Sequence, residues 1–162
     1  MRNGVVDKGT NGVAGEIGLM NMGRRLSTGR KVFQEAVGYR HFARFMGATD
    51  DPENALRALA SIEVPTPEFL AALNDWADRL AAGMLNAIYL IDPQLILITG
   101  PLAMLYRKVD TRVQERIRAF YIPGLPIPRI STVGADQMLP AIGASAYVRE
   151  ELFMLPVLDA AT

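Results

Sequence analysis

The sequence predicts an α/β domain in which long amphipathic helices alternate with short apolar strands. Leu95 to Thr99 is an uninterrupted run rich in β-branched residues, the pattern of a strand that is covered on both faces. It stands between two helical patterns, Thr66 to Ile91 and Leu102 to Phe120. Such alternation is typical of layered domains with a partly parallel sheet.

The composition agrees with a single soluble globular domain. The chain has 162 residues, 50% of them hydrophobic, and a formal net charge of zero, which argues against disorder and against direct nucleic-acid binding. It contains no cysteine, which excludes disulfides and thiolate metal sites. No apolar run reaches the roughly 18 residues of a membrane span, and no signal segment opens the chain. We therefore expect a cytoplasmic protein.

The first elements are short. Met1 to Lys8 is expected to be the tail of a β-hairpin. A helix is predicted from Lys31 to about Met46, where apolar residues recur every three to four positions and Gly47 can form the C-cap. His41, the only histidine, lies in this helix without a partner motif. We interpret it as a packing or solvent-facing residue, and a catalytic role is the alternative.

Two further helices have clear N-terminal signals. The shorter is predicted from Asp51 to Ala60, with Asp50 or Asp51 as N-cap and Pro52 at the first position. The longest is predicted from Thr66 to Ile91, capped by Thr66 and ended by Asp92-Pro93.

The apolar stripe of the longest helix includes Trp76, which we interpret as a core residue rather than a sugar-stacking platform. The run Ala81-Ala82-Gly83 is a small-residue patch where another element can approach closely.

After the strand, Thr99-Gly100-Pro101 turns into the helix from Leu102 to Phe120. A strand, a glycine turn and a helix N-terminus can present N–H groups to a phosphate, so Gly100 is a weak candidate for cofactor binding. Pro101 removes one donor there. The basic residues of this helix are interpreted as a solvated face, with a binding stripe as the alternative: Arg107, Lys108, Arg112, Arg116 and Arg118.

The last part of the chain repeats the alternation. Tyr121 to Pro128 holds three of the ten prolines and cannot form regular structure. Arg129 to Val133 is the predicted last strand. A helix from about Met138 to Phe153 follows, and its Gly143-Ala144 pair favours tight packing.

The candidate site lies in Asn11 to Glu35. Glu16 follows Gly15 directly in a glycine-rich turn, and Glu35 closes the polar and basic loop that comes next. Glycine lets the backbone approach a ligand closely, and a carboxylate can accept hydrogen bonds from the hydroxyls of a sugar. The alternative interpretation is an ordinary surface turn.

Three motifs carry a resemblance to a known family. Gly12 to Gly18, GVAGEIG, resembles the G-x-A-G-E-x-G-H signature of the ROK family, the sugar kinases and sugar-responsive repressors related to hexokinase. Asp92 to Gly100 is similar to the family's N-P-x-x-I-V-I-G-G strand and phosphate loop, and Gly134 to Val148 to its closing L-x-G-A-A helix.

The zinc loop of that family, C-x-C-G-x-x-G-C-x-E, is matched only in part. Laid over Leu26 to Glu35, it places the family glycine at Gly29 and the closing glutamate at Glu35, with Val32 at the second glycine position. The histidine of the first motif and the three cysteines are replaced by Leu19, Leu26, Thr28 and Phe33. Because a structural zinc needs Cys or His donors, we expect no zinc, and an apolar plug of Leu19, Leu26 and Phe33 in its place.

The resemblance implies the carboxy-terminal lobe of an actin-like ATPase (ribonuclease-H-like) fold, helix-rich with a small and incomplete mixed sheet. It makes residues 1–162 a single sugar-binding and dimerisation domain without the amino-terminal lobe or a DNA-binding domain. The chain is then a fragment, and a complete small protein with an N-terminal ribbon is the alternative. Glu16, Glu35 and Gly15 are the expected substrate-binding residues.

The chemistry expected from this resemblance is binding rather than catalysis. The family's ATP-binding D-x-G-G-T and catalytic N-D-x-N motifs belong to the other lobe, and neither occurs here; Asn74-Asp75 lies within a helix and does not match. Phosphoryl transfer needs a cradle for the ATP phosphates and a base that orients the sugar hydroxyl, which these two motifs supply in the family. We expect the sugar-sensing, homodimeric domain of a regulator similar to the N-acetylglucosamine repressor, which would reach DNA only through another domain. The alternatives are the substrate-binding lobe of a sugar kinase and a dimerisation domain without ligand.

Overall fold

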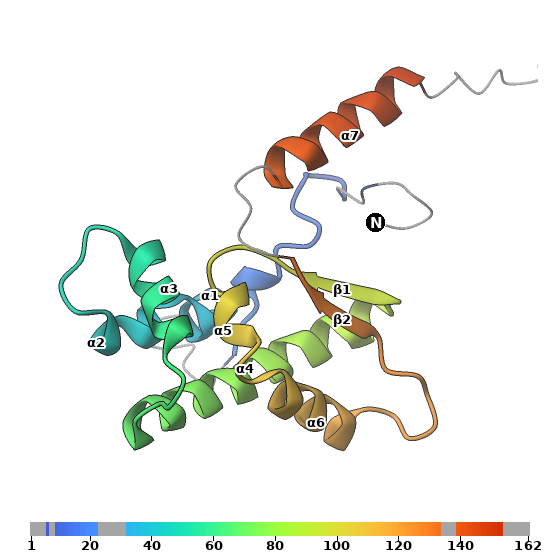
Figure 1. Cartoon of the computed structure of the whole chain (residues 1–162). Coiled ribbons are helices and arrows are strands. Elements are labelled where there is room, and N and C mark those ends of the chain that lie inside the picture. The colour runs from blue at the N-terminus through green and yellow to red at the C-terminus, as the bar shows by residue number, and fades with distance from the viewer. Residues whose placement is uncertain (1–5, 7–8, 23–31, 134–138, 154–162) are drawn as a thin grey trace, which may run out of the picture.

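The computed structural model describes residues 6, 9–22, 32–133 and 139–153 (Figure 1). Within these ranges the chain is a helix-rich α/β domain with a small sheet of two parallel strands, which confirms the predicted class. The expected hairpin tail, Met1 to Lys8, lies outside the described residues apart from Val6.

Helix α4, Pro67–Ile91, crosses the domain beneath the sheet in Figure 1 and supplies much of the core. The Thr66 hydroxyl accepts a hydrogen bond from the Phe69 N–H at 3.3 Å, and Asp92 ends the helix in the left-handed conformation with φ 49°. Both ends agree with the sequence prediction. Trp76 is buried, as predicted, and its indole Nε1–H donates to the Val37 carbonyl at 2.8 Å.

The two strands run parallel and in register from Leu95↔Arg129 to Ile98↔Thr132. They are β1, Leu95–Ile98, and β2, Arg129–Thr132. Ile96 and Ile98 pack against the core, whereas Leu95 and Leu97 are 43% and 50% exposed. The prediction of a strand covered on both faces is therefore wrong for the described part of the chain. Successive strand residues point to opposite faces, and the buried core lies on only one of them.

The helix predicted from Lys31 to Met46 is divided into three short pieces, α1 (Phe33–Val37), the 3₁₀ helix η2 (Tyr39–Phe42) and α2 (Ala43–Met46). Gly38 interrupts it with an extended backbone, and a β-carbon there would lie 2.5 Å from the Gln34 carbonyl oxygen. The interruption leaves the Val37 carbonyl free to accept the hydrogen bond from Trp76. A tertiary contact thus replaces a helical one.

The predicted helix from Leu102 to Phe120 is also divided, into α5 (Ala103–Tyr106) and α6 (Asp110–Phe120). The Asp110 carboxylate accepts the Thr111 N–H at 2.6 Å, a local bond that competes with continuous helix. With the helix divided here, Tyr106 and Val109 are both buried in the core. α6 then packs along α4.

Helix α3, Pro52–Ser61, begins as predicted, because the Asp51 carboxylate accepts the Asn54 N–H at 2.9 Å. It contacts α2 on one side and α5 on the other. Its buried residues Leu56 and Leu59 join the same core as α4 and α6.

The last helix, α7 (Leu139–Phe153), stands apart from α4, α5 and α6 (Figure 1). Within the described part of the chain, a β-carbon on Gly143 would meet no atom within 4 Å and Ala144 is exposed, so the tight packing expected at Gly143-Ala144 is not found there. Ile142 and Val148 are exposed. Among the described residues, none of the helices combines the length and hydropathy that a membrane crossing requires.

Candidate functional sites

Gly15 and Glu16 lie in a compact turn that leads into the 3₁₀ helix η1, Ile17–Leu19. Gly15 has φ +88°, in the region that favours glycine, and its carbonyl accepts the Ile17 N–H at 2.6 Å. The carbonyl of Glu16 accepts the Leu19 N–H at 3.1 Å. The backbone of Glu16 is thereby fixed while its side chain is exposed to solvent.

The structure brings this turn against the start of α1, where Glu35 occupies the first helical turn. The Phe33 N–H donates to the Met20 carbonyl at 2.9 Å, and Asn21 and Val32 form an antiparallel bridge. Glu35 is exposed, like Glu16. The two segments predicted to carry the site therefore adjoin, with both carboxylates at the surface.

The positions that correspond to zinc ligands have different environments. Leu19 is 45% exposed, so it does not form the buried plug expected from the sequence. Phe33 does pack inward, with its ring against Gly83 of α4, which confirms the predicted close approach at the small-residue patch. Leu26 and Thr28 lie outside the described residues. The described residues contain no group of three or more His, Asp or Glu side chains suited to a metal ion.

His41 belongs to the packing of η2 on α4. Its Nε2 lies 2.9 Å from the Ala72 carbonyl oxygen and 3.8 Å from the Asp75 carboxylate. Its ring meets Phe42 edge-on, with 4.9 Å between the centroids. This agrees with the packing role predicted for it.

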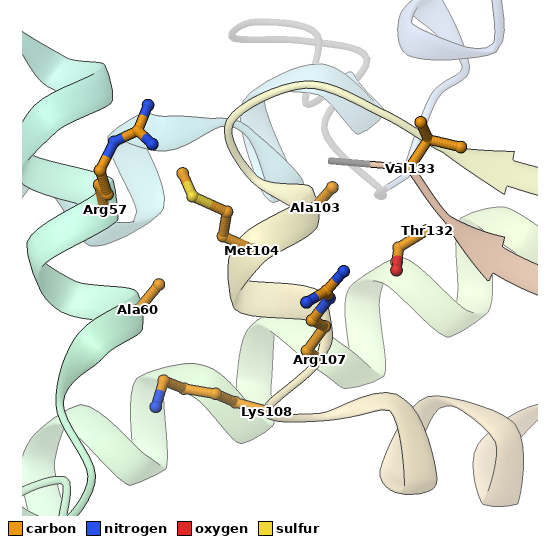
Figure 2. A pocket seen from close by; sticks show the side chains of 8 residues that line it. All are labelled: Arg57, Ala60, Ala103, Met104, Arg107, Lys108, Thr132 and Val133. Carbon is orange, nitrogen blue, oxygen red and sulfur yellow. The ribbon is translucent and has the colours of Figure 1, made fainter. Parts of the chain in front are cut away.

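A cavity of about 490 Å³ opens between α3, α5 and the end of β2 (Figure 2). The structure places three basic side chains on its lining: Arg57 from α3, and Arg107 and Lys108 from the end of α5. Its remaining described lining residues are Ala60, Ala103, Met104, Thr132 and Val133.

The basic residues of the helix predicted from Leu102 to Phe120 thus separate into two groups. Arg107 and Lys108 line the cavity, whereas Arg112 and Arg116 bind Asp78 of α4. The Arg112 pair is bidentate, with both N···O distances 2.8 Å, and it is the main reason that the pKa of Asp78 lies below its ordinary value. The sequence did not indicate the cavity, because Arg57 and Arg107 are far apart along the chain.

Gly100, the weak cofactor-binding candidate, forms the turn after β1 with φ +85°. Its carbonyl accepts the Ala103 N–H at 3.0 Å, so this turn uses a donor that a phosphate would need. The neighbouring residues Thr99 and Pro101 line a second, mainly apolar depression of about 360 Å³ beside Tyr39 of η2. Pro101 offers no N–H. The turn therefore has few donors for an anion.

Comparison of the chain with known proteins adds no relative. No model of a protein family, no curated protein and no solved structure matches it. The functional interpretation accordingly rests on the residues and their geometry.

Proposed function

We propose that this chain is the sugar-sensing and dimerisation domain of a cytoplasmic ROK-type transcriptional regulator of carbohydrate metabolism, built as the carboxy-terminal lobe of an actin-like fold. Glu16 and Glu35 accept hydrogen bonds from ring hydroxyls of a monosaccharide or aminosugar, and Gly15 allows the ligand to approach the backbone. Sugar binding then shifts the arrangement of the lobes and, through a separate domain, the affinity for DNA.

The observation that carries the proposal is the contact between η1 and α1. The hydrogen bond from Phe33 to Met20 and the Asn21–Val32 bridge hold two carboxylate-bearing segments side by side. Both carboxylates are exposed and can meet a polyol. The turn at Gly15, with its positive φ, supports the glycine-dependent approach that the motif suggests.

The second candidate is the substrate-binding lobe of a ROK sugar kinase. The departures at Leu19 and at the zinc-loop positions favour the regulator, because a sensor has no phosphoryl transfer to maintain. The D-x-G-G-T and N-D-x-N motifs do not occur in this sequence. We therefore propose a binding function for the chain rather than catalysis.

Isothermal titration calorimetry with a panel of hexoses and N-acetylhexosamines tests the site. We expect saturable binding of at least one sugar by the wild type. Glu16→Gln and Glu35→Gln should each weaken sugar binding by about tenfold. This is the loss of affinity expected when one or two charge-assisted hydrogen bonds are removed.

Glu115→Gln is the matched control, because Glu115 is an exposed glutamate on α6. It should leave sugar binding unchanged. Identical isotherms for the wild type and the two site variants would refute the assignment of Glu16 and Glu35.

A further inference from the structure

The cavity between α3, α5 and β2 has three basic side chains on its lining. Its described lining residues include two arginines and a lysine but no carboxylate. Glu53, the acid paired with Arg57 at 3.2 Å, is one turn away on α3 and lines the other depression instead. The lining therefore carries an excess of positive charge.

Much of the donor capacity in this cavity is unused. Within the described ranges, the backbone N–H of Arg107 donates to the Leu105 carbonyl, but its side chain makes no hydrogen bond and no ion pair, although the guanidinium carries five N–H donors. Lys108 donates to the Ile62 carbonyl, which occupies one of its three N–H groups. Figure 2 shows Met104 extending from α5 toward α3, with Arg57 near its tip, Arg107 on the side of Thr132, and Lys108 at the lower end of the cavity. Basic side chains from α3 and from the end of α5 therefore border the cavity on different sides.

The cavity also lies where α/β proteins bind ligands. Thr132 and Val133 stand at the carboxyl end of β2, and the Val133 N–H donates to the Ile98 carbonyl at the same end of β1. In open parallel sheets, ligands bind outside the carboxyl ends of the strands. The Thr132 hydroxyl adds a neutral donor or acceptor to the cationic lining.

From these observations we infer a binding site for a small phosphate monoester, with the phosphate bound by the free guanidinium of Arg107 and with Lys108 and Arg57 adding positive charge at the border of the cavity. Guanidinium groups bind phosphate oxygens through paired N–H donors, and lysine contributes a point charge. The volume of about 490 Å³ falls in the range of small-molecule sites and leaves room beyond a phosphate ion. The methyl and thioether groups of Ala60, Ala103 and Met104 would contact the organic part of the ligand. This site is separate from the proposed sugar site at Glu16 and Glu35.

Calorimetry at low ionic strength with inorganic phosphate, glucose 6-phosphate and adenosine monophosphate tests the inference. We expect at least one ester to bind with one-to-one stoichiometry and more tightly than inorganic phosphate. The two esters distinguish a sugar phosphate from a nucleotide. Arg107→Ala should weaken that binding by about tenfold or more, because it removes charge-assisted hydrogen bonds, and Arg107→Lys should weaken it less.

Arg118→Ala is the control of equal charge change, since Arg118 is exposed and lines a different depression on α6. It should leave the affinity within about twofold of wild type. Glu16→Gln should also leave the binding of inorganic phosphate and of adenosine monophosphate unchanged, because Glu16 belongs to the separate sugar site proposed above. The inference is overturned if none of the three phosphates gives saturable binding. It is equally overturned if Arg107→Ala and Arg118→Ala weaken binding by the same factor, because the effect would then come from net charge alone.

Discussion

The ring of Phe33 lies over Gly83 of α4 so closely that a β-carbon at position 83 would be 2.1 Å from the ring carbon Cε2. Gly83→Ala should therefore destabilise the fold by about 1–3 kcal/mol, the usual result of overpacking. In the Phe33→Ala background the same change should be neutral or stabilising by up to about 1 kcal/mol, since alanine is the better helix former. Urea unfolding of the four proteins measures this reversal of sign, and equal effects in both backgrounds would contradict the contact.

The carboxylate of Asp78 joins α4 to α6 through Arg112 and Arg116. Its pKa is lowered, first by the hydrogen bond from Arg112. The ionised form is thus favoured in the folded state, so its contribution to stability is present above pH of about 4 and is lost as the pH falls through the folded-state pKa. Asp78→Asn should cost about 1 kcal/mol or less near pH 7, because about a third of the side chain is exposed and screened.

Unfolding free energies measured from pH 7 to pH 3 test this contribution. The wild type should lose more stability over this interval than Asp78→Asn, and the difference between the two curves should become smaller toward the acid end. Glu53→Gln is the control, because Glu53 forms an exposed pair with Arg57 within α3. Parallel curves for the wild type and Asp78→Asn would show that the pair contributes nothing.

The hydroxyl of Tyr106 is buried without a hydrogen-bond partner in the described part of the chain. Burial, together with the nearby charge of Asp110, raises the pKa of Tyr106 to about 12. Tyr106→Phe should be neutral or stabilise the fold by about 1 kcal/mol, because it removes an unsatisfied buried hydroxyl.

The same residue should affect stability at alkaline pH. A raised folded-state pKa gives a contribution that is complete below pH 10 and is lost as the pH rises toward 12. Thermal melts in this interval should fall more steeply for the wild type than for Tyr106→Phe. A variant destabilised by well over 1 kcal/mol at pH 7 would show instead that the hydroxyl is satisfied.

The elements with local signals could be predicted from the sequence. The ends of α4 are set by Thr66 and Asp92, and the start of α3 by Asp51, all through contacts within a few residues. The breaks at Gly38 and before Asp110 could not be predicted, because they depend on Trp76 binding the Val37 carbonyl and on the burial of distant side chains. Tertiary contacts overrode helical periodicity at both places.

The candidate sites also differ in whether they could be predicted from the sequence. The pairing of the Glu16 and Glu35 segments was expected from motifs that are adjacent in sequence, and the contact of η1 with α1 agrees with it. The electropositive cavity combines α3, α5 and the end of β2. Arg107 and Lys108 were interpreted from the sequence as part of a solvated face, and only the fold places them on the same cavity as Arg57 of α3.

The free edge and the exposed face of strand β1 have a consequence for work with the purified chain. Within the described residues, β1 is hydrogen-bonded on one side only and presents Leu95 and Leu97 to water. An apolar strand with a free edge presents unpaired N–H and C=O groups with which another chain can pair. Concentrated samples should therefore self-associate into β-rich aggregates over time, and dilute, freshly prepared protein is the suitable material for binding measurements.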